Sequence, residues 1–162
     1  MSGAVLIAAS SCIVETNPSE SVSTQNDFFQ FDSEVTEVER IFELVIPPGA
    51  LDRSYRSEVR LTGGVALDPS TGVDFVLGPP IDKTVKVGED NTLEGNIFDW
   101  KPPEECSGGC TLRVPITIRR IGSGIGADVS WGIGFSMWID GPPSETAANM
   151  AARLLDGNGD EL

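Results

Sequence analysis

DVSWGIGFSMWID, residues 128–140, alternates large apolar side chains with small or acidic ones, and Trp138 is the one large side chain out of phase. Successive side chains of a strand point to opposite faces of a sheet, so this period of two predicts one long strand with a single core face. We expect Trp131, on the apolar side, to be buried and Trp138, of opposite parity, to be partly exposed. The apolar positions are Val129, Trp131, Ile133, Phe135, Met137 and Ile139.

Two other segments alternate in the same way and predict long strands. In residues 111–120, Pro115 lacks the N–H that a ladder hydrogen bond needs, so we expect an edge or bulged position there. In residues 55–67, the Gly63-Gly64 pair predicts a β-bulge. The apolar positions of the two segments are Tyr55, Val59, Leu61, Val65, Leu67, Leu112, Val114, Ile116 and Ile118.

Shorter β-prone segments complete the pattern. Residues 35–46 also fit helical spacing, with Thr36 and Glu39 as a capping box, but their β-branched residues and the following Pro47-Pro48-Gly49 favour a strand. About eight strands without strand–helix alternation predict an all-β fold, an antiparallel β-sandwich of the Ig-like or jelly-roll kind. The other short segments are 28–32, 73–77, 84–87 and 93–98.

We expect this sandwich to occupy residues 27–143 and a short helix with an acidic tail to occupy residues 144–162. Ser144 can cap a helix over 145–155, and Gly157 follows its end. The apolar face of that helix would consist of Ala147, Met150, Ala151 and Leu154.

Residues 1–14 (MSGAVLIAASSCIV) contain an uncharged apolar run that is too short to form a transmembrane helix. A short apolar run that ends in small residues predicts an export signal instead. Ala9-Ser10-Ser11-Cys12 resembles the lipobox of bacterial lipoproteins, although Ala9 stands where leucine is usual and no Lys or Arg precedes the run. The resemblance implies acylation of Cys12 and a membrane anchor. The alternative is a buried first strand with Cys12 as a small core residue.

Residues 15–26 (ETNPSESVSTQN) have the polar, Pro- and Ser-containing composition of a flexible tether. Cys106 and Cys110 are separated by Ser107-Gly108-Gly109 and predict a disulfide in an oxidising compartment. The alternatives are two free thiols or half of a metal site, for whose other ligands the sequence has no histidine and only Cys12 as a further cysteine.

The composition excludes several function classes. With no histidine, the chain has no Ser-His-Asp or Cys-His machinery. A net charge of −14 repels phosphate backbones, so we expect no nucleic-acid partner. Its 25 acidic residues would permit carboxylate-based hydrolysis, but no feature of the sequence selects one pair.

One candidate ligand site lies on the outward face of residues 128–140. Small side chains leave a flat strip that a planar ring, a sugar or another backbone could contact beside an indole. The alternative is that the C-terminal helix or a long loop packs there. The residues of this strip are Ser130, Gly132, Gly134, Ser136 and Trp138.

A second, weaker candidate is a calcium site at Asp156, Asn158 and Asp160, whose oxygen-bearing side chains alternate as in the first half of a calcium loop. The bidentate Glu of an EF-hand loop is missing, so a frayed acidic tail is the alternative. We expect no other cofactor.

These observations together predict an exported, lipid-anchored, non-catalytic binding or structural module at a bacterial cell surface or in the periplasm. Its partners would be the membrane, through the anchor, and a protein or glycan. The alternatives are a carbohydrate-active domain, either a sugar-binding module or a carboxylate-based hydrolase, and a subunit of a surface assembly that pairs through a strand edge.

Overall fold

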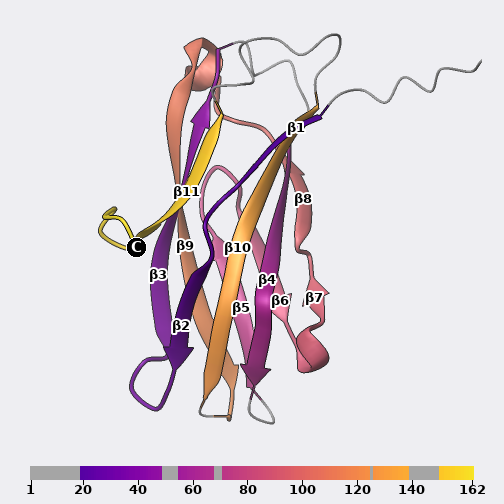
Figure 1. Cartoon of the computed structure of the whole chain (residues 1–162), viewed down its shortest axis with the longest axis vertical. Helices are drawn as coiled ribbons and strands as arrows, with labels where there is room; N and C mark the ends of the chain where they lie inside the picture. The colour runs from indigo at the N-terminus through magenta and orange to yellow at the C-terminus, as the bar shows by residue number, and fades with distance from the viewer. Residues whose placement is uncertain (1–18, 49–54, 68–70, 125, 139–149) are drawn as a thin grey trace, which may run out of the picture.

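The computed structural model describes residues 19–48, 55–67, 71–124, 126–138 and 150–162. Two antiparallel sheets pack face to face, which confirms the predicted β-sandwich (Figure 1). The first sheet has the order β1-β10-β4-β8, with β2 also paired to β10, and the second has the order β11-β3-β9-β5-β6-β7. The strands are β1 (Ser19–Ser23), β2 (Asp27–Phe31), β3 (Glu37–Ile46), β4 (Tyr55–Leu67), β5 (Thr71–Leu77), β6 (Lys83–Val87), β7 (Leu93–Glu94), β8 (Ile97–Trp100), β9 (Cys110–Gly122), β10 (Ala127–Trp138) and β11 (Ala151–Asp156), with short 3-10 turns η2 (Glu89–Asn91) and η3 (Glu104–Gly108).

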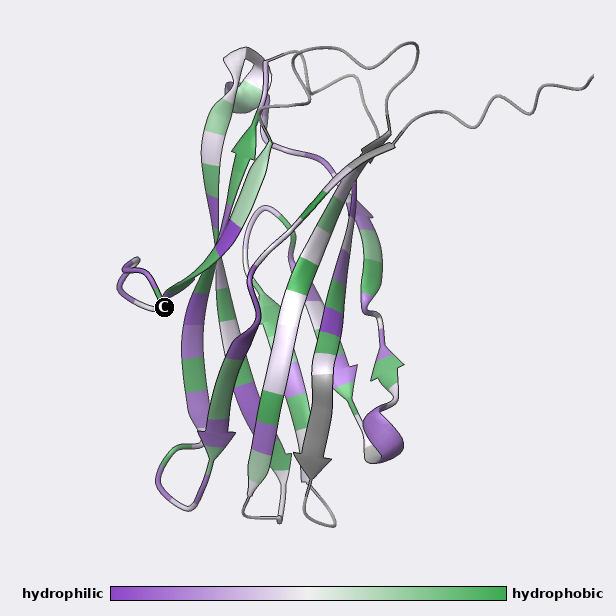
Figure 2. Cartoon of the chain, in the orientation of Figure 1, coloured by the Kyte–Doolittle hydropathy of each residue, from purple (hydrophilic) through white to green (hydrophobic). Residues whose placement is uncertain are grey.

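The alternation that predicted the strands also forms the core, as the hydropathy stripes along the strands show (Figure 2). Trp131 of β10 is fully buried, as expected, and its ring centroid lies 4.9 Å from that of Phe75 in the opposite sheet. The Trp131 indole nitrogen donates to Asp27 Oδ2 at 2.9 Å. Arg40 of β3 donates to the same oxygen at 3.0 Å, so one buried carboxylate links the two sheets.

The bulge predicted at Gly63-Gly64 is confirmed by the β4–β10 register. Val129 pairs with Val65 but Trp131 pairs with Leu61, so three residues of β4, numbers 62–64, face one residue of β10. The extra residues interrupt the ladder, which resumes with Val65 opposite Val129 and continues to Leu67 opposite Ala127.

Within residues 35–46 the structure has a strand, β3 from Glu37 to Ile46, as favoured over a helix. Residues 93–98 divide between the two sheets. β7 pairs with β6 in the second sheet, whereas β8 pairs with β4 in the first. Gly95, at a φ of 74°, lies at the crossing, where a left-handed backbone favours glycine.

The edge position expected for Pro115 is wrong, because β9 lies between β3 and β5. Gly78 donates its N–H to the Pro115 carbonyl at 2.8 Å. In an antiparallel ladder the N–H and C=O of one residue face the same neighbour, so the Pro115 nitrogen faces the point where β5 ends at Leu77. A proline is tolerated inside the sheet at this position because β5 has ended and no strand carbonyl there needs an N–H from residue 115.

The tether predicted at 15–26 is wrong from Ser19 onwards, because β1 and β2 form one edge strand along β10. Residues 24–26 bulge out between Ser23, paired with Gly134, and Asp27, paired with Trp131. Gln25 extends from this bulge to the other sheet, where its side chain donates to the Leu154 carbonyl at 2.7 Å and accepts from the Leu154 N–H at 3.0 Å. The sandwich therefore begins before residue 27.

The prediction of a C-terminal helix is also wrong for the residues that the structure describes. Residues 151–156 form β11, which pairs with β3 from Ala151 opposite Val45 to Asp156 opposite Arg40. The helical spacing is only a local preference. Pairing with the edge of β3 overrides this preference, because the pairing supplies backbone hydrogen bonds and buries Leu154 and Leu155. Residues 144–149 of the predicted helix lie outside the described part.

Candidate functional site

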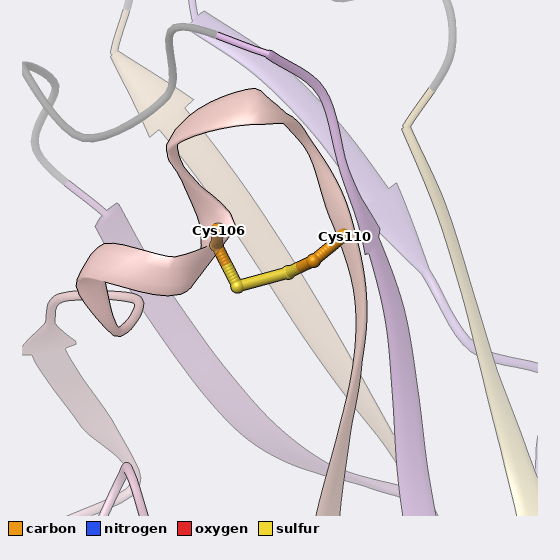
Figure 3. The surroundings of a disulfide bond; sticks show 2 residues. All are labelled: Cys106 and Cys110. Atoms are coloured by element: carbon orange, nitrogen blue, oxygen red, sulfur yellow. A yellow bond between two sulfur atoms is a disulfide. The ribbon is translucent and has the colours of Figure 1, made fainter.

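The predicted disulfide between Cys106 and Cys110 is present, with the two Cα atoms 5.0 Å apart (Figure 3). Cys106 lies in the turn η3 and is buried, and Cys110 opens β9. Gly109, at a φ of 87°, returns its N–H to the Cys106 carbonyl at 2.9 Å. The glycine spacer thus provides the tight turn that brings the two sulfur atoms together.

The predicted strip on β10 does not form an open backbone surface. Gly132 and Gly134 are buried, and Ser130 and Ser136 are half-buried. The guanidinium of Arg60, from β4, covers Gly134, where a Cβ would overlap it. Trp138 ends β10 opposite Ser19, and its side chain lies outside the described part.

A small depression of about 40 Å³ remains over Gly132. The Thr24 hydroxyl and the Asn26 side-chain oxygen stand 3.5 and 3.6 Å from the position that a Cβ of Gly132 would take, so a larger residue there would narrow the depression. The lining residues are Ser23, Thr24, Asn26, Arg60, Thr62, Gly132 and Ile133.

Phe28 stands on the same face of the first sheet and is 61 % exposed. It pairs across β2–β10 with Ser130, whose hydroxyl is hydrogen-bonded to that of Thr62 at 2.7 Å. Sequence reasoning missed this residue although the signal was present. The motif DFFQF at 27–31 alternates buried and exposed positions, which places Phe28 outside while Phe29 packs in the core.

The outer face of the second sheet is arranged differently, around the buried carboxylate of Glu43. Arg153 donates to Glu43 Oε1 at 2.7 Å and Arg113 to Oε2 at 2.8 Å. The hydrogen bond from Arg153 and then that from Arg113 hold the pKa of Glu43 below its usual value, although burial opposes the shift. This ion cluster ties β11, β3 and β9 together and is structural.

Of the predicted calcium ligands, the Asp156 side chain is hydrogen-bonded within a turn, and the calcium site stays a prediction. Asp156 Oδ1 accepts the N–H groups of Asn158 and Asp160, each at 2.9 Å. The N–H of Asp160, followed by those of Asn158 and Gly159, lowers the pKa of Asp156 although desolvation opposes the shift. Among the described residues, no three carboxylate or cysteine side chains gather as a metal site.

Cys12 lies outside the described residues, so its predicted acylation stays a prediction. Within the described ranges, no helix is long and apolar enough to span a membrane. Comparison of the chain with family models, curated proteins and solved structures found no match.

Proposed function

We propose that this protein is an exported, lipid-anchored, non-catalytic β-sandwich that acts as a binding or structural module on the outer side of a bacterial membrane. The observation that carries the proposal is the Cys106–Cys110 disulfide, because disulfides persist in oxidising, extracytoplasmic compartments. The apolar run before Cys12 and the lipobox-like residues support export and acylation.

The extent of β1 sets how far such an anchor would hold the domain from the membrane. β1 begins at Ser19, so seven peptide steps separate it from Cys12. At roughly 3.3–3.6 Å per residue these steps reach at most about 25 Å. The end of the sandwich at which β1 begins, which also carries the η3 turn, would therefore face the lipid surface (Figure 1).

A test of the proposal is expression in a bacterial host behind a complete signal peptide, followed by intact-mass analysis of the membrane fraction. We expect the mature chain to start at Cys12, to carry lipid there and to partition into detergent. Cys12→Ala should abolish the lipid mass and the detergent partitioning while leaving the Cys106–Cys110 bond in place. An unmodified chain in the cytoplasm with all thiols free would contradict the proposal.

A second candidate function, sugar binding, is favoured by one observation. Phe28 presents an exposed aromatic ring on the outer face of the first sheet, two residues after Asn26, which lines a small depression over Gly132. Aromatic rings flanked by a few convergent polar groups are typical of small-ligand sites.

A further inference from the structure

We propose that Phe28 and the depression over Gly132 bind one neutral pyranose unit of a glycan. This deepens the binding-module part of the proposed function and does not depend on the lipid anchor. We call the residues concerned the Phe28 site; they are Asn26, Phe28, Arg60, Thr62, Ser130 and Gly132.

The Phe28 ring stands on a firmly held strand. Its chain neighbour Asp27 is buried and accepts hydrogen bonds from Trp131 and Arg40. Its other neighbour, Phe29, is buried under the Arg40 guanidinium, 5.5 Å from the ring centroid. A ring on so fixed a backbone loses little conformational freedom when a ligand covers it, so it suits stacking against the C–H face of a sugar.

The polar groups of the Phe28 site match sugar hydroxyls. Thr62 and Ser130 use one hydrogen bond between their hydroxyls, and each hydroxyl retains further capacity. In the part of the chain that the structure describes, the side-chain amide of Asn26 has no hydrogen-bond partner and is exposed. The depression of about 40 Å³ exceeds the roughly 10–15 Å³ that a cavity needs to hold one water, so it admits a hydroxyl group.

Charge favours a neutral sugar over an acidic one. The Arg60 Nε donates to Glu58 at 3.0 Å, which balances the cation at the rim of the site. The net charge of −14 repels anions from the whole molecule. The terminal N–H groups of Arg60 can still donate hydrogen bonds to a sugar hydroxyl.

The arrangement of apolar residues disfavours a protein partner or a lipid surface on this face. Among the first-sheet side chains that the structure describes, the other large exposed apolar one is Ile97, which is 55 % exposed on β8. β10 and β4 lie between β8 and β2, so Ile97 and Phe28 lie near opposite edges of the same face and do not contact each other. Protein and membrane contacts need a larger contiguous apolar surface than one ring.

The test uses the full chain, labelled with ¹⁵N, and NMR titration with three neutral tetrasaccharides: β-1,4-linked glucose, β-1,4-linked N-acetylglucosamine and α-1,6-linked mannose. We expect at least one to cause saturable shifts, with a dissociation constant of about 1 mM or below, in the backbone amides of 24–28 and 130–134 and in the Asn26 side chain. Phe28→Ala should weaken that binding by about tenfold or more, and Phe28→Trp should preserve it. The matched control Ile97→Ala removes a similarly exposed side chain from the same face and should leave affinity unchanged.

Three outcomes would overturn the proposal: no shifts with any of the three sugars up to about 10 mM, shifts that persist undiminished in Phe28→Ala, or self-association of the chain that Phe28→Ala abolishes. The last result would mean that a second copy covers the ring. Because the titration needs no acylated Cys12, failure here and failure of the lipid anchor are separate results.

Discussion

Replacement of Trp131 by alanine should destabilise the protein by about 3–5 kcal/mol, the range for truncating a large aromatic residue in a packed core. The indole is fully buried and contacts Phe75 across the two sheets, so its removal leaves a cavity that neither sheet can fill without moving the other. The lost hydrogen bond to Asp27 adds only about 0.5–1.5 kcal/mol, because Arg40 still donates to the same oxygen.

Urea unfolding followed by far-UV circular dichroism measures this change in the free energy of unfolding. Phe28→Ala is the matched control, since it truncates an aromatic residue of the same sheet at a position that is 61 % exposed, and it should change stability by no more than about 0.5 kcal/mol. Trp131→Phe should fall between the two variants. Equal losses of stability for Trp131→Ala and Phe28→Ala would refute the placement of Trp131 in the core and of Phe28 on the outer face.

Two further predictions concern the links between the sheets and the ion cluster. Gln25→Ala removes both hydrogen bonds to Leu154 and should lower the free energy of unfolding by about 1–3 kcal/mol. The Leu154 amide should also exchange its hydrogen faster, and an unchanged exchange rate would show that residues 24–26 do not hold β11. The lowered pKa of Glu43 stabilises the fold at pH values above the unfolded pKa near 4.5, and that contribution is lost as the pH falls through the folded pKa. Glu43→Gln should therefore flatten the loss of stability below about pH 4.5 in acid titrations of the unfolding midpoint. Arg153→Met should flatten it as well, and a slope unchanged in both variants would contradict this origin of acid sensitivity.

The sequence predicted the local features of the structure well. Alternation over residues 128–140 identified β10 and the burial of Trp131, and Gly63-Gly64 located the bulge in β4. The spacing of Cys106 and Cys110 identified the disulfide. These features are set within a few residues of chain, because side-chain parity, backbone freedom at glycine and short-loop closure depend on near neighbours.

The candidate site was predicted only in part. The sequence selected the small residues at 130–136 but not what covers them, because Arg60 and Asn26 reach Gly134 and Gly132 from distant parts of the chain. The sequence placed Phe28 in a short strand but did not indicate which face of the sheet its ring would occupy, so its exposure was not predicted.

The sequence by itself determined the long strands and which side of each one faces the core. Only the tertiary structure decided how the edges are completed: Ser19–Ser23 became a strand rather than a tether, and Ala151–Asp156 a strand rather than part of a helix. Both segments have composition or spacing that favours another state locally. Their backbones nonetheless pair with β10 and β3, which would otherwise leave a row of N–H and C=O groups unpaired at the edge of each sheet. Because β10 and β3 are distant in the chain, no local sequence pattern indicates this pairing.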